Sequence, residues 1–119
     1  MVDLAPDALP LACNLAALDA AERKQHGIVT EHLLSTVVDV RELANGYAFG
    51  CRHDDTLWMT AAQFVDRERR CCPFFTFGLE LDNQTNTVWL RLTGPEGVKE
   101  FVRHEFVNNL PSLTSAEMH

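Results

Sequence analysis

The chain has 119 residues, of which 46% are hydrophobic and 23% charged, and its formal net charge is −7. A chain of this length buries roughly two thirds of its unfolded surface, so this composition predicts one ordinary folded domain and excludes a disordered protein. The acidic balance argues against a nucleic-acid partner, because binding to a polyanion depends on clustered Lys and Arg.

The cellular compartment is predicted from two features of the sequence. The first dozen residues carry no Lys or Arg and contain two prolines, so they do not resemble a signal peptide. No apolar run approaches the roughly 20 residues that a membrane span needs. We therefore predict a cytoplasmic protein without a membrane partner, in which four cysteines are more often reduced, metal-binding or catalytic than paired as structural disulfides.

The domain boundaries follow from where the sequence turns polar. We expect a flexible N-terminus over residues 1–12, one α+β domain over residues 13–107 and a frayed C-terminal tail over residues 108–119. The tail contains a proline and several Ser and Thr residues, which favour an irregular chain.

The first predicted elements are a helix and a hairpin. Apolar residues near helical spacing predict a helix over about residues 17–34, weakened by Gly27. A Val-rich run over residues 36–43 and an alternating run over residues 47–53 predict two paired strands. The dipeptide Asn45-Gly46 between them favours a type I′ turn.

A second helix is predicted from about residue 57 to residue 70, capped by residues 54–56 and ended by Pro73. Its inward-facing stripe begins with apolar residues and continues, at the same helical spacing, into a carboxylate and two thiols. The stripe consists of Leu57, Ala61, Phe64, Val65, Glu68, Cys71 and Cys72. Polar groups with reactive chemistry thus occupy positions where apolar side chains would be expected.

The remaining elements are a second hairpin and a last helix. Alternating apolar and polar residues predict strands over about residues 75–81 and 88–93. Thr93 and Pro95 are the residue types of a helix cap and a first turn, so a last helix should follow them. The order α-β-β-α-β-β-α predicts a four-stranded antiparallel sheet made of two hairpins, with helices on one face.

The adjacent cysteines Cys71 and Cys72 suit a metal ion better than a mutual disulfide. Neighbouring Cα atoms lie about 3.8 Å apart, below the range of about 4.4 to 6.8 Å that disulfides prefer. Two thiolates on one tetrahedral ion lie under about 4 Å from each other, and soft ions favour such ligands. Cys13, just ahead of the first helix, is the best candidate for a third sulfur ligand, and Glu68 for an oxygen ligand or a proton acceptor.

The charge balance around the cysteine pair has two opposing contributions. Arg67, Arg69 and Arg70 precede the pair and would lower the pKa of a thiol, whereas the C-terminal end of a helix dipole would raise it. The sequence leaves the direction of the shift open.

Two segments, Glu68–Phe74 and Val88–Gly97, resemble a family of small uncharacterised bacterial proteins. That family has an E-R-x-C-C-P-F segment and a W-L-x-L-T-G-P-E-G segment, and its members tend to carry Cys-x-Leu before the first helix, which Cys13–Leu15 matches. The resemblance covers nearly the whole predicted domain. It implies no settled activity, but it implies that four residues belong together and that Cys51 lies outside the pattern. The four are Cys13, Glu68, Cys71 and Cys72.

Structural explanations compete with each functional one. Two adjacent cysteines can be small hydrophobic residues that close a core, and Cys51 on an apolar strand face fits that role best. Glu68 could reach Arg91 or another cation at the core edge. The five histidines show no metal-ligand spacing, although His53 and His104 are the least improbable ligands among them.

Three functional hypotheses remain open from the sequence. The first is a protein that buffers, carries or senses a thiophilic ion such as zinc, copper(I), mercury(II) or arsenic(III), bound by Cys71 and Cys72 with Cys13. The second is a thiol redox enzyme that uses the same cysteines on a peroxide or a disulfide. The third is an interaction module that forms a homodimer through its open sheet face, near Trp89 and Arg91.

Overall fold

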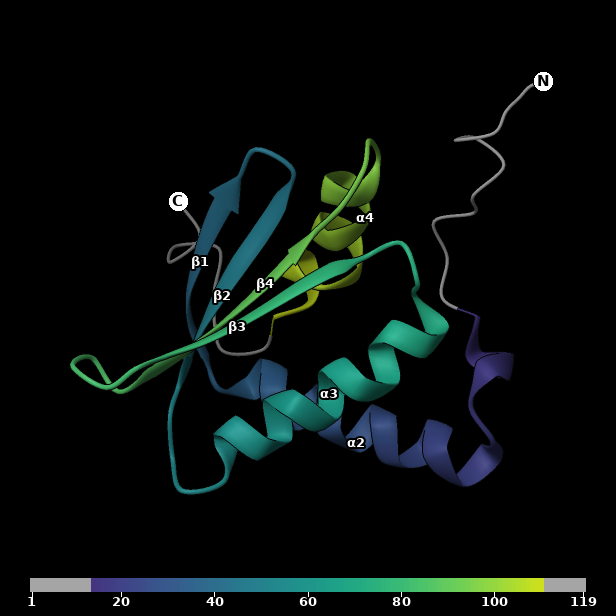
Figure 1. Ribbon diagram of the computed structural model, residues 1–119, viewed down its shortest axis with the longest axis horizontal. Coiled ribbons are helices and arrows are strands. Elements are labelled where there is room, and N and C mark those ends of the chain that lie inside the picture. Colours follow the sequence, from purple (N-terminus) through teal and green to yellow (C-terminus); the bar gives the residue numbers. More distant parts are fainter. Residues whose placement is uncertain (1–13, 111–119) are drawn as a thin grey trace.

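The computed structural model describes residues 14–110, and its helices and strands confirm the predicted α+β order. In chain order the elements of Figure 1 are the 3-10 helix Leu15–Ala17, α2 (Ala20–Ser35), β1 (Val37–Leu43), β2 (Gly46–Arg52), α3 (Leu57–Cys71), β3 (Thr76–Asp82), β4 (Thr87–Thr93), α4 (Val98–Glu105) and the 3-10 helix Val107–Asn109.

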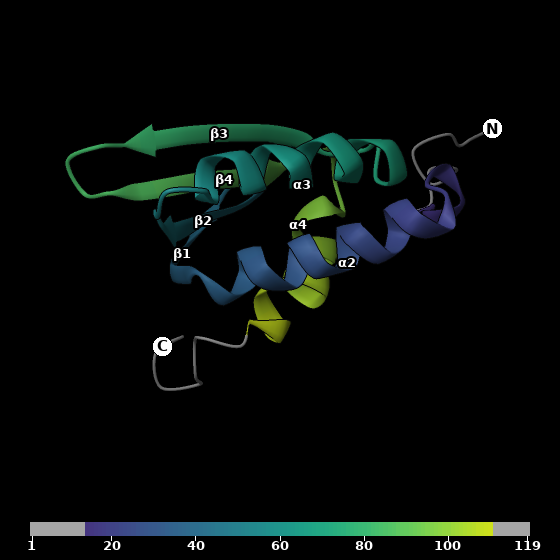
Figure 2. The same ribbon diagram turned by 90° about the horizontal axis from the view of Figure 1, so that it is seen from below.

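The four strands form one antiparallel sheet in the order β1-β2-β4-β3, so the two hairpins meet at β2 and β4. In Figure 1, α2 and α3 lie side by side below the strands, while α4 stands beside β2 and β4. Figure 2 shows the same α2–α3 pair along its length. The sheet and all three helices share one buried apolar cluster.

Alternation along β2 and β4 places one row of side chains in this core, as predicted. Tyr47 and Phe49 pair with Leu92 and Leu90 across the two strands, and all four are buried. The opposite face carries Arg41, whose guanidinium lies 4.4 Å from the ring centroid of Trp89. It also carries Arg91, which lies 3.2 Å from Oε1 of Glu80. The face without helices is therefore polar and charged.

The predicted inner stripe of α3 is confirmed in the helix that carries the candidate site. Leu57, Ala61, Phe64, Glu68 and Cys71 are the buried residues of α3. Before it, Oδ1 of Asp54 accepts the Thr56 backbone N–H at 2.9 Å, but the Thr56 side chain makes no capping hydrogen bond. The orientation of α3 is thus fixed mainly by burial of this stripe.

The predicted type I′ turn between the first two strands is wrong. Leu43 pairs with Gly46, so the loop residues are Ala44 and Asn45, and neither has a positive φ. Gly46 belongs to β2 instead. It lies so close to β4 that a Cβ atom at this position would overlap the carbonyl oxygen of Leu92. This glycine therefore allows β2 and β4 to approach closely, and the turn does not require it.

The predicted cap of the last helix is also wrong. Helix α4 begins at Val98 after Gly97, which has φ 95° and supplies the N-cap position, so Thr93 does not cap it. Only glycine adopts this left-handed conformation without strain.

The described chain ends inside the core. The 3-10 helix Val107–Asn109 is followed by Leu110, which is buried, so packing extends into the segment predicted to form a tail. The rest of that segment and the predicted flexible N-terminus lie outside the described residues. Within residues 14–110, no helix has the length and apolar character needed to cross a membrane.

Candidate metal and thiol site

The adjacent cysteines lie at the C-terminal end of α3, where the helix closes onto the core. The Cys72 backbone N–H donates to the Glu68 carbonyl at 2.7 Å, and Pro73 follows. Cys71 is 1% exposed and Cys72 is fully buried. Their sulfur atoms are 4.0 Å apart. The site is therefore closed off from bulk water on the side of both sulfurs.

Glu68 contacts both sulfur atoms, as its helical spacing predicts. Its Oε2 lies 3.3 Å from the Cys72 sulfur and its Oε1 lies 3.9 Å from the Cys71 sulfur. The carboxylate is 4% exposed. It does not reach Arg91, the partner considered from the sequence, because Arg91 pairs with Glu80.

The residue that Glu68 does contact on a neighbouring helix is His26 of α2. Nε2 of His26 lies 2.7 Å from Oε1 of Glu68, and the imidazole is buried and stacked at 5.5 Å on the ring of Phe64. Its other nitrogen, Nδ1, is buried and has no hydrogen-bond partner within residues 14–110. The imidazole thus keeps one ring nitrogen, Nδ1, that could bind a ligand.

Three ligand types converge at this point. One ring nitrogen of His26, one oxygen of Glu68 and Sγ of Cys71 lie within 4.8 Å of one another, and all three residues are buried. Nitrogen, carboxylate and thiolate are the ligands that zinc and related ions use. No other such group occurs among the described residues, so neither His53 nor His104 takes part in one.

The sequence carries a signal for His26 that metal-ligand spacing does not capture. His26, Val29 and Leu33 are the buried residues of α2, at intervals of three and four positions. This spacing places His26 on the apolar stripe of its helix, where an imidazole needs a buried partner.

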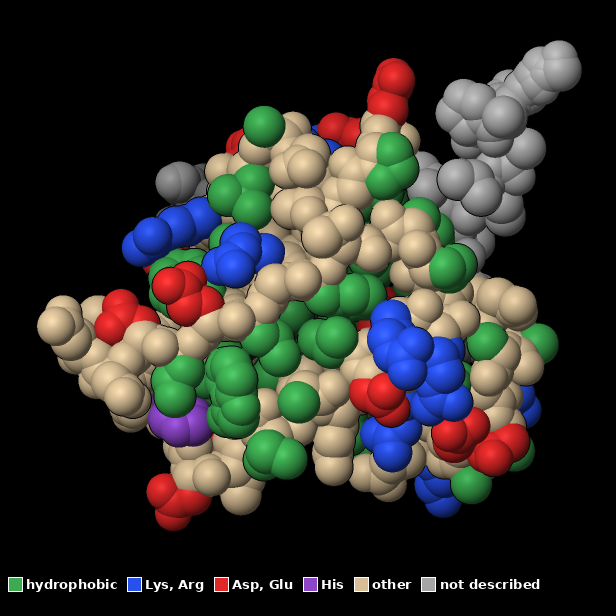
Figure 3. All heavy atoms as spheres, in the orientation of Figure 1, with side chains coloured by type: hydrophobic (Ala, Val, Ile, Leu, Met, Phe, Trp, Pro, Cys, Tyr) green, Lys and Arg blue, Asp and Glu red, His purple; other side chains and the backbone are tan. Residues whose placement is uncertain are grey.

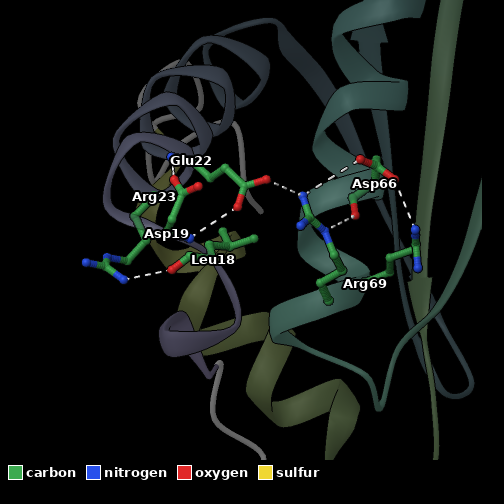
Figure 4. Close-up of polar contacts among 7 residues, drawn as sticks. Leu18, Asp19, Glu22, Arg23, Asp66 and Arg69 are labelled. Carbon is green, nitrogen blue, oxygen red and sulfur yellow. Dashed lines mark hydrogen bonds and ion pairs between the residues drawn. The ribbon is translucent and has the colours of Figure 1, made fainter.

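The surroundings of Cys71 raise the pKa of its thiol to about 11, chiefly through burial and then through the negative charge of Glu68. The arginines before the cysteine pair do not reverse this. Arg70 binds Oε2 of Glu22 at 3.0 Å. Arg69 binds Oδ1 of Asp66 at 3.2 Å, as a dashed line in Figure 4 shows. Cys71 is therefore a neutral thiol at pH 7, and a metal ion has to displace its proton.

The cysteines differ in oxidation state. Cys51 and Cys71 are free thiols, whereas Cys72 is disulfide-bonded. The third predicted sulfur ligand, Cys13, lies outside the described residues. Its neighbour Asn14 is described, and the Asn14 backbone N–H donates to the Cys71 carbonyl at 2.7 Å. The start of the described chain is thus hydrogen-bonded to the end of α3.

Cys51 has the structural role predicted for it, in the core between β1 and β4. It is fully buried, and burial raises the pKa of its thiol to about 11. We expect native protein to react with iodoacetamide at Cys51 far more slowly than denatured protein at pH 8, followed by peptide mass spectrometry. Equal rates in the two states would contradict this burial.

The same raised pKa values predict how stability depends on pH. The folded state holds the protons of Cys51 and Cys71 more tightly than the unfolded state, in which a thiol has a pKa near 9. The contribution of these two thiols to the free energy of unfolding is therefore fully present below about pH 9, and it decreases as the pH rises toward 11. Urea denaturation across this range would measure the decrease, and a Cys51→Ala variant should show a smaller one.

In comparisons with known proteins, no family model, no curated protein and no solved structure matches this chain.

Proposed function

We propose that this protein binds a thiophilic metal or metalloid ion through Cys71 and Cys72, with Cys13 as a third sulfur ligand, and buffers, carries or senses that ion. The observation that carries this proposal is the convergence of His26, Glu68 and Cys71 within 4.8 Å in a buried site. Burial of the Glu68 carboxylate beside two sulfur atoms lowers the free energy of unfolding, so a role in binding explains its position better than a role in stability.

The distances fit a tetrahedral ion with little movement. Two thiolates, each about 2.3 Å from such an ion, lie about 3.8 Å apart. The sulfur atoms of Cys71 and Cys72 are 4.0 Å apart. Glu68 and His26 add an oxygen and a nitrogen for a borderline ion such as zinc, whereas a softer ion such as arsenic(III) would favour sulfur ligands.

The position of Asn14 supports including Cys13 in the ligand set. The Asn14 backbone N–H donates to the Cys71 carbonyl oxygen at 2.7 Å, so the residue that follows Cys13 in the sequence is hydrogen-bonded to the end of α3.

Ion binding by Cys72 requires that its disulfide be reduced first. A dithiol reductant would give two electrons and two protons to the disulfide, which becomes two thiols, while the reductant becomes a disulfide. The two released thiols would then complete the ligand set around Glu68. The proposed site is therefore available only in a reducing environment.

The oxidised state of Cys72 also favours a second candidate, a thiol redox enzyme. In that mechanism a substrate disulfide or peroxide is reduced while two thiols of the protein form a disulfide. The raised pKa of Cys71 argues against Cys71 as the attacking group, because the neutral thiol is a weak nucleophile. Cys72 would then have to attack.

Cys13→Ser separates the two candidates, with Cys51→Ala as a matched control that removes a thiol outside the site. In anaerobic, reduced protein, the ion-binding proposal predicts at least about 10-fold weaker arsenite affinity for Cys13→Ser, because a sulfur ligand is lost. The control should keep the wild-type affinity.

The redox candidate predicts a different result for the same variant. Peroxide treatment of Cys13→Ser would trap a sulfenic acid or a mixed disulfide on Cys72, visible by mass spectrometry, with no change in arsenite affinity. That outcome would replace the ion-binding proposal with the enzymatic one.

A further inference from the structure

The two edge strands of the sheet are protected to different extents. Both edge strands carry charged residues, but only β1 has a register irregularity, between Val37 and Asp39. Bulges and charged residues are the usual protection against pairing with another chain. Strand β3 pairs with β4 in continuous register and shows no bulge. The β3 edge is therefore the more open to a new strand.

The core-facing side of β3 leaves apolar surface exposed. Leu81 is 36% exposed, and Phe77 and Leu79 are only partly buried. Helix α3 also exposes two large hydrophobic side chains, Trp58 at 36% and Met59 at 63%. Figure 3 shows hydrophobic side chains gathered over β3 and α3 in the centre of this view. An apolar area that borders an open strand edge is typical of an interaction surface.

We propose that β3 pairs with β3 of a second copy of this chain, antiparallel and about a two-fold axis at Leu79, so that two sheets join into one. In this register Leu79 faces the partner's Leu79, and Phe77 faces the partner's Leu81. On the other face, Gly78 lies opposite the partner's Glu80. This interface is independent of the proposed ion site.

Charge complementarity across the axis favours a second copy as the occupant. The Arg91 guanidinium lies over Gly78, where an added Cβ would be 2.7 Å from its Nη2 atom, and it also pairs with Glu80 of its own chain at 3.2 Å. Residues directly opposite in an antiparallel pair have Cβ atoms about 5 Å apart. Arg91 would therefore lie between its own Glu80 and the partner's Glu80.

Two-fold symmetry doubles this arrangement and matches the other face as well. Two arginines would alternate with two glutamates on the outer face, while apolar side chains meet only apolar side chains beneath the sheet. An isologous interface requires this kind of self-complementarity, in which one surface fits its own copy. The β3 strand satisfies it in the register centred on Leu79.

Sedimentation equilibrium in the presence of a thiol reductant tests the proposal. We expect wild-type protein to form a reversible dimer within the micromolar to millimolar range. Leu81→Glu should weaken the dimer at least about 10-fold, because it places a carboxylate opposite an apolar ring. The matched control, Val38→Glu, changes an exposed residue of the opposite edge strand and should leave dimerisation unchanged.

A charge exchange keeps the test decisive if Leu81→Glu fails to fold. Glu80→Arg and Arg91→Glu should each weaken the dimer by placing like charges together, and the double variant should restore it. Wild-type protein that remains a monomer over the whole concentration range would overturn the proposal. A dimer that Val38→Glu disrupts, and that the variants of β3 and β4 do not, would also overturn it.

Discussion

Changing Cys71 to serine is expected to weaken binding of zinc or arsenite by at least about 100-fold. Loss of residues that only support a ligand weakens metal affinity by about 10- to 100-fold, and loss of a thiolate ligand should exceed this. Cys71 is the sulfur that converges with His26 and Glu68 within 4.8 Å. Competition with a chromophoric chelator, in anaerobic reduced protein, measures the change.

His26→Gln sets the scale for this experiment, because it removes the imidazole and keeps a polar side chain. We expect a loss of affinity for zinc of about 10-fold or more, and a smaller one for arsenite, which depends on sulfur ligands. Cys51→Ala is the control and should bind both ions as wild type does. Equal affinities for wild type and Cys71→Ser would show that Cys71 is not a ligand of the ion.

Phe64→Ala is expected to lower the free energy of unfolding by about 3 to 5 kcal/mol, as for other large aromatic residues in a core. Phe64 is 1% exposed and lies between the ring of His26, stacked at 5.5 Å, and the ring of Phe106, edge-on at 6.2 Å. Its removal leaves a cavity between α2, α3 and the end of α4. Urea denaturation gives the value.

Met59→Ala is the matched control on the same helix, because Met59 is 63% exposed. Its effect should stay within about 0.5 kcal/mol. Phe64→Ala should also weaken ion binding, since the imidazole loses the ring that holds it against Glu68. A Phe64→Ala variant as stable as the control would contradict this packing.

Short-range periodicity explains why most elements could be predicted from the sequence. Alternation along Thr76–Asp82 and Thr87–Thr93 marked both strands of the second hairpin, because a half-buried sheet needs a two-residue period. The stripe that ends in Glu68 and Cys71 followed from a helical period in the same way. Both patterns are local, and neither depends on the rest of the fold.

The two errors in turns and caps arose where distant parts of the chain decide the local conformation. Gly46 is required by the approach of Leu92 from another hairpin, which the dipeptide Asn45-Gly46 does not reveal. Gly97 adopts a positive φ and begins α4 in place of a side-chain cap. Residue types fixed the location of each turn, but tertiary contacts fixed its form.

The candidate site also combines residues that lie close together through local spacing with one residue that is brought there by the tertiary fold. Glu68, Cys71 and Cys72 belong to one helix end, so their proximity followed from spacing alone. His26 is 42 positions away from Glu68 and meets it only because α2 packs on α3. Its buried spacing with Val29 and Leu33 was a signal, but the identity of its partner depends on the tertiary fold.

Native mass spectrometry of anaerobically purified, reduced protein tests the central claim most directly. Wild type and a variant with Cys71 and Cys72 both changed to alanine would be compared, with and without zinc, copper(I) and arsenite. We predict that wild type binds one ion stoichiometrically and that the equally folded variant does not. Absence of any bound ion on reduced wild-type protein would contradict ion binding and direct the search to peroxide and disulfide substrates.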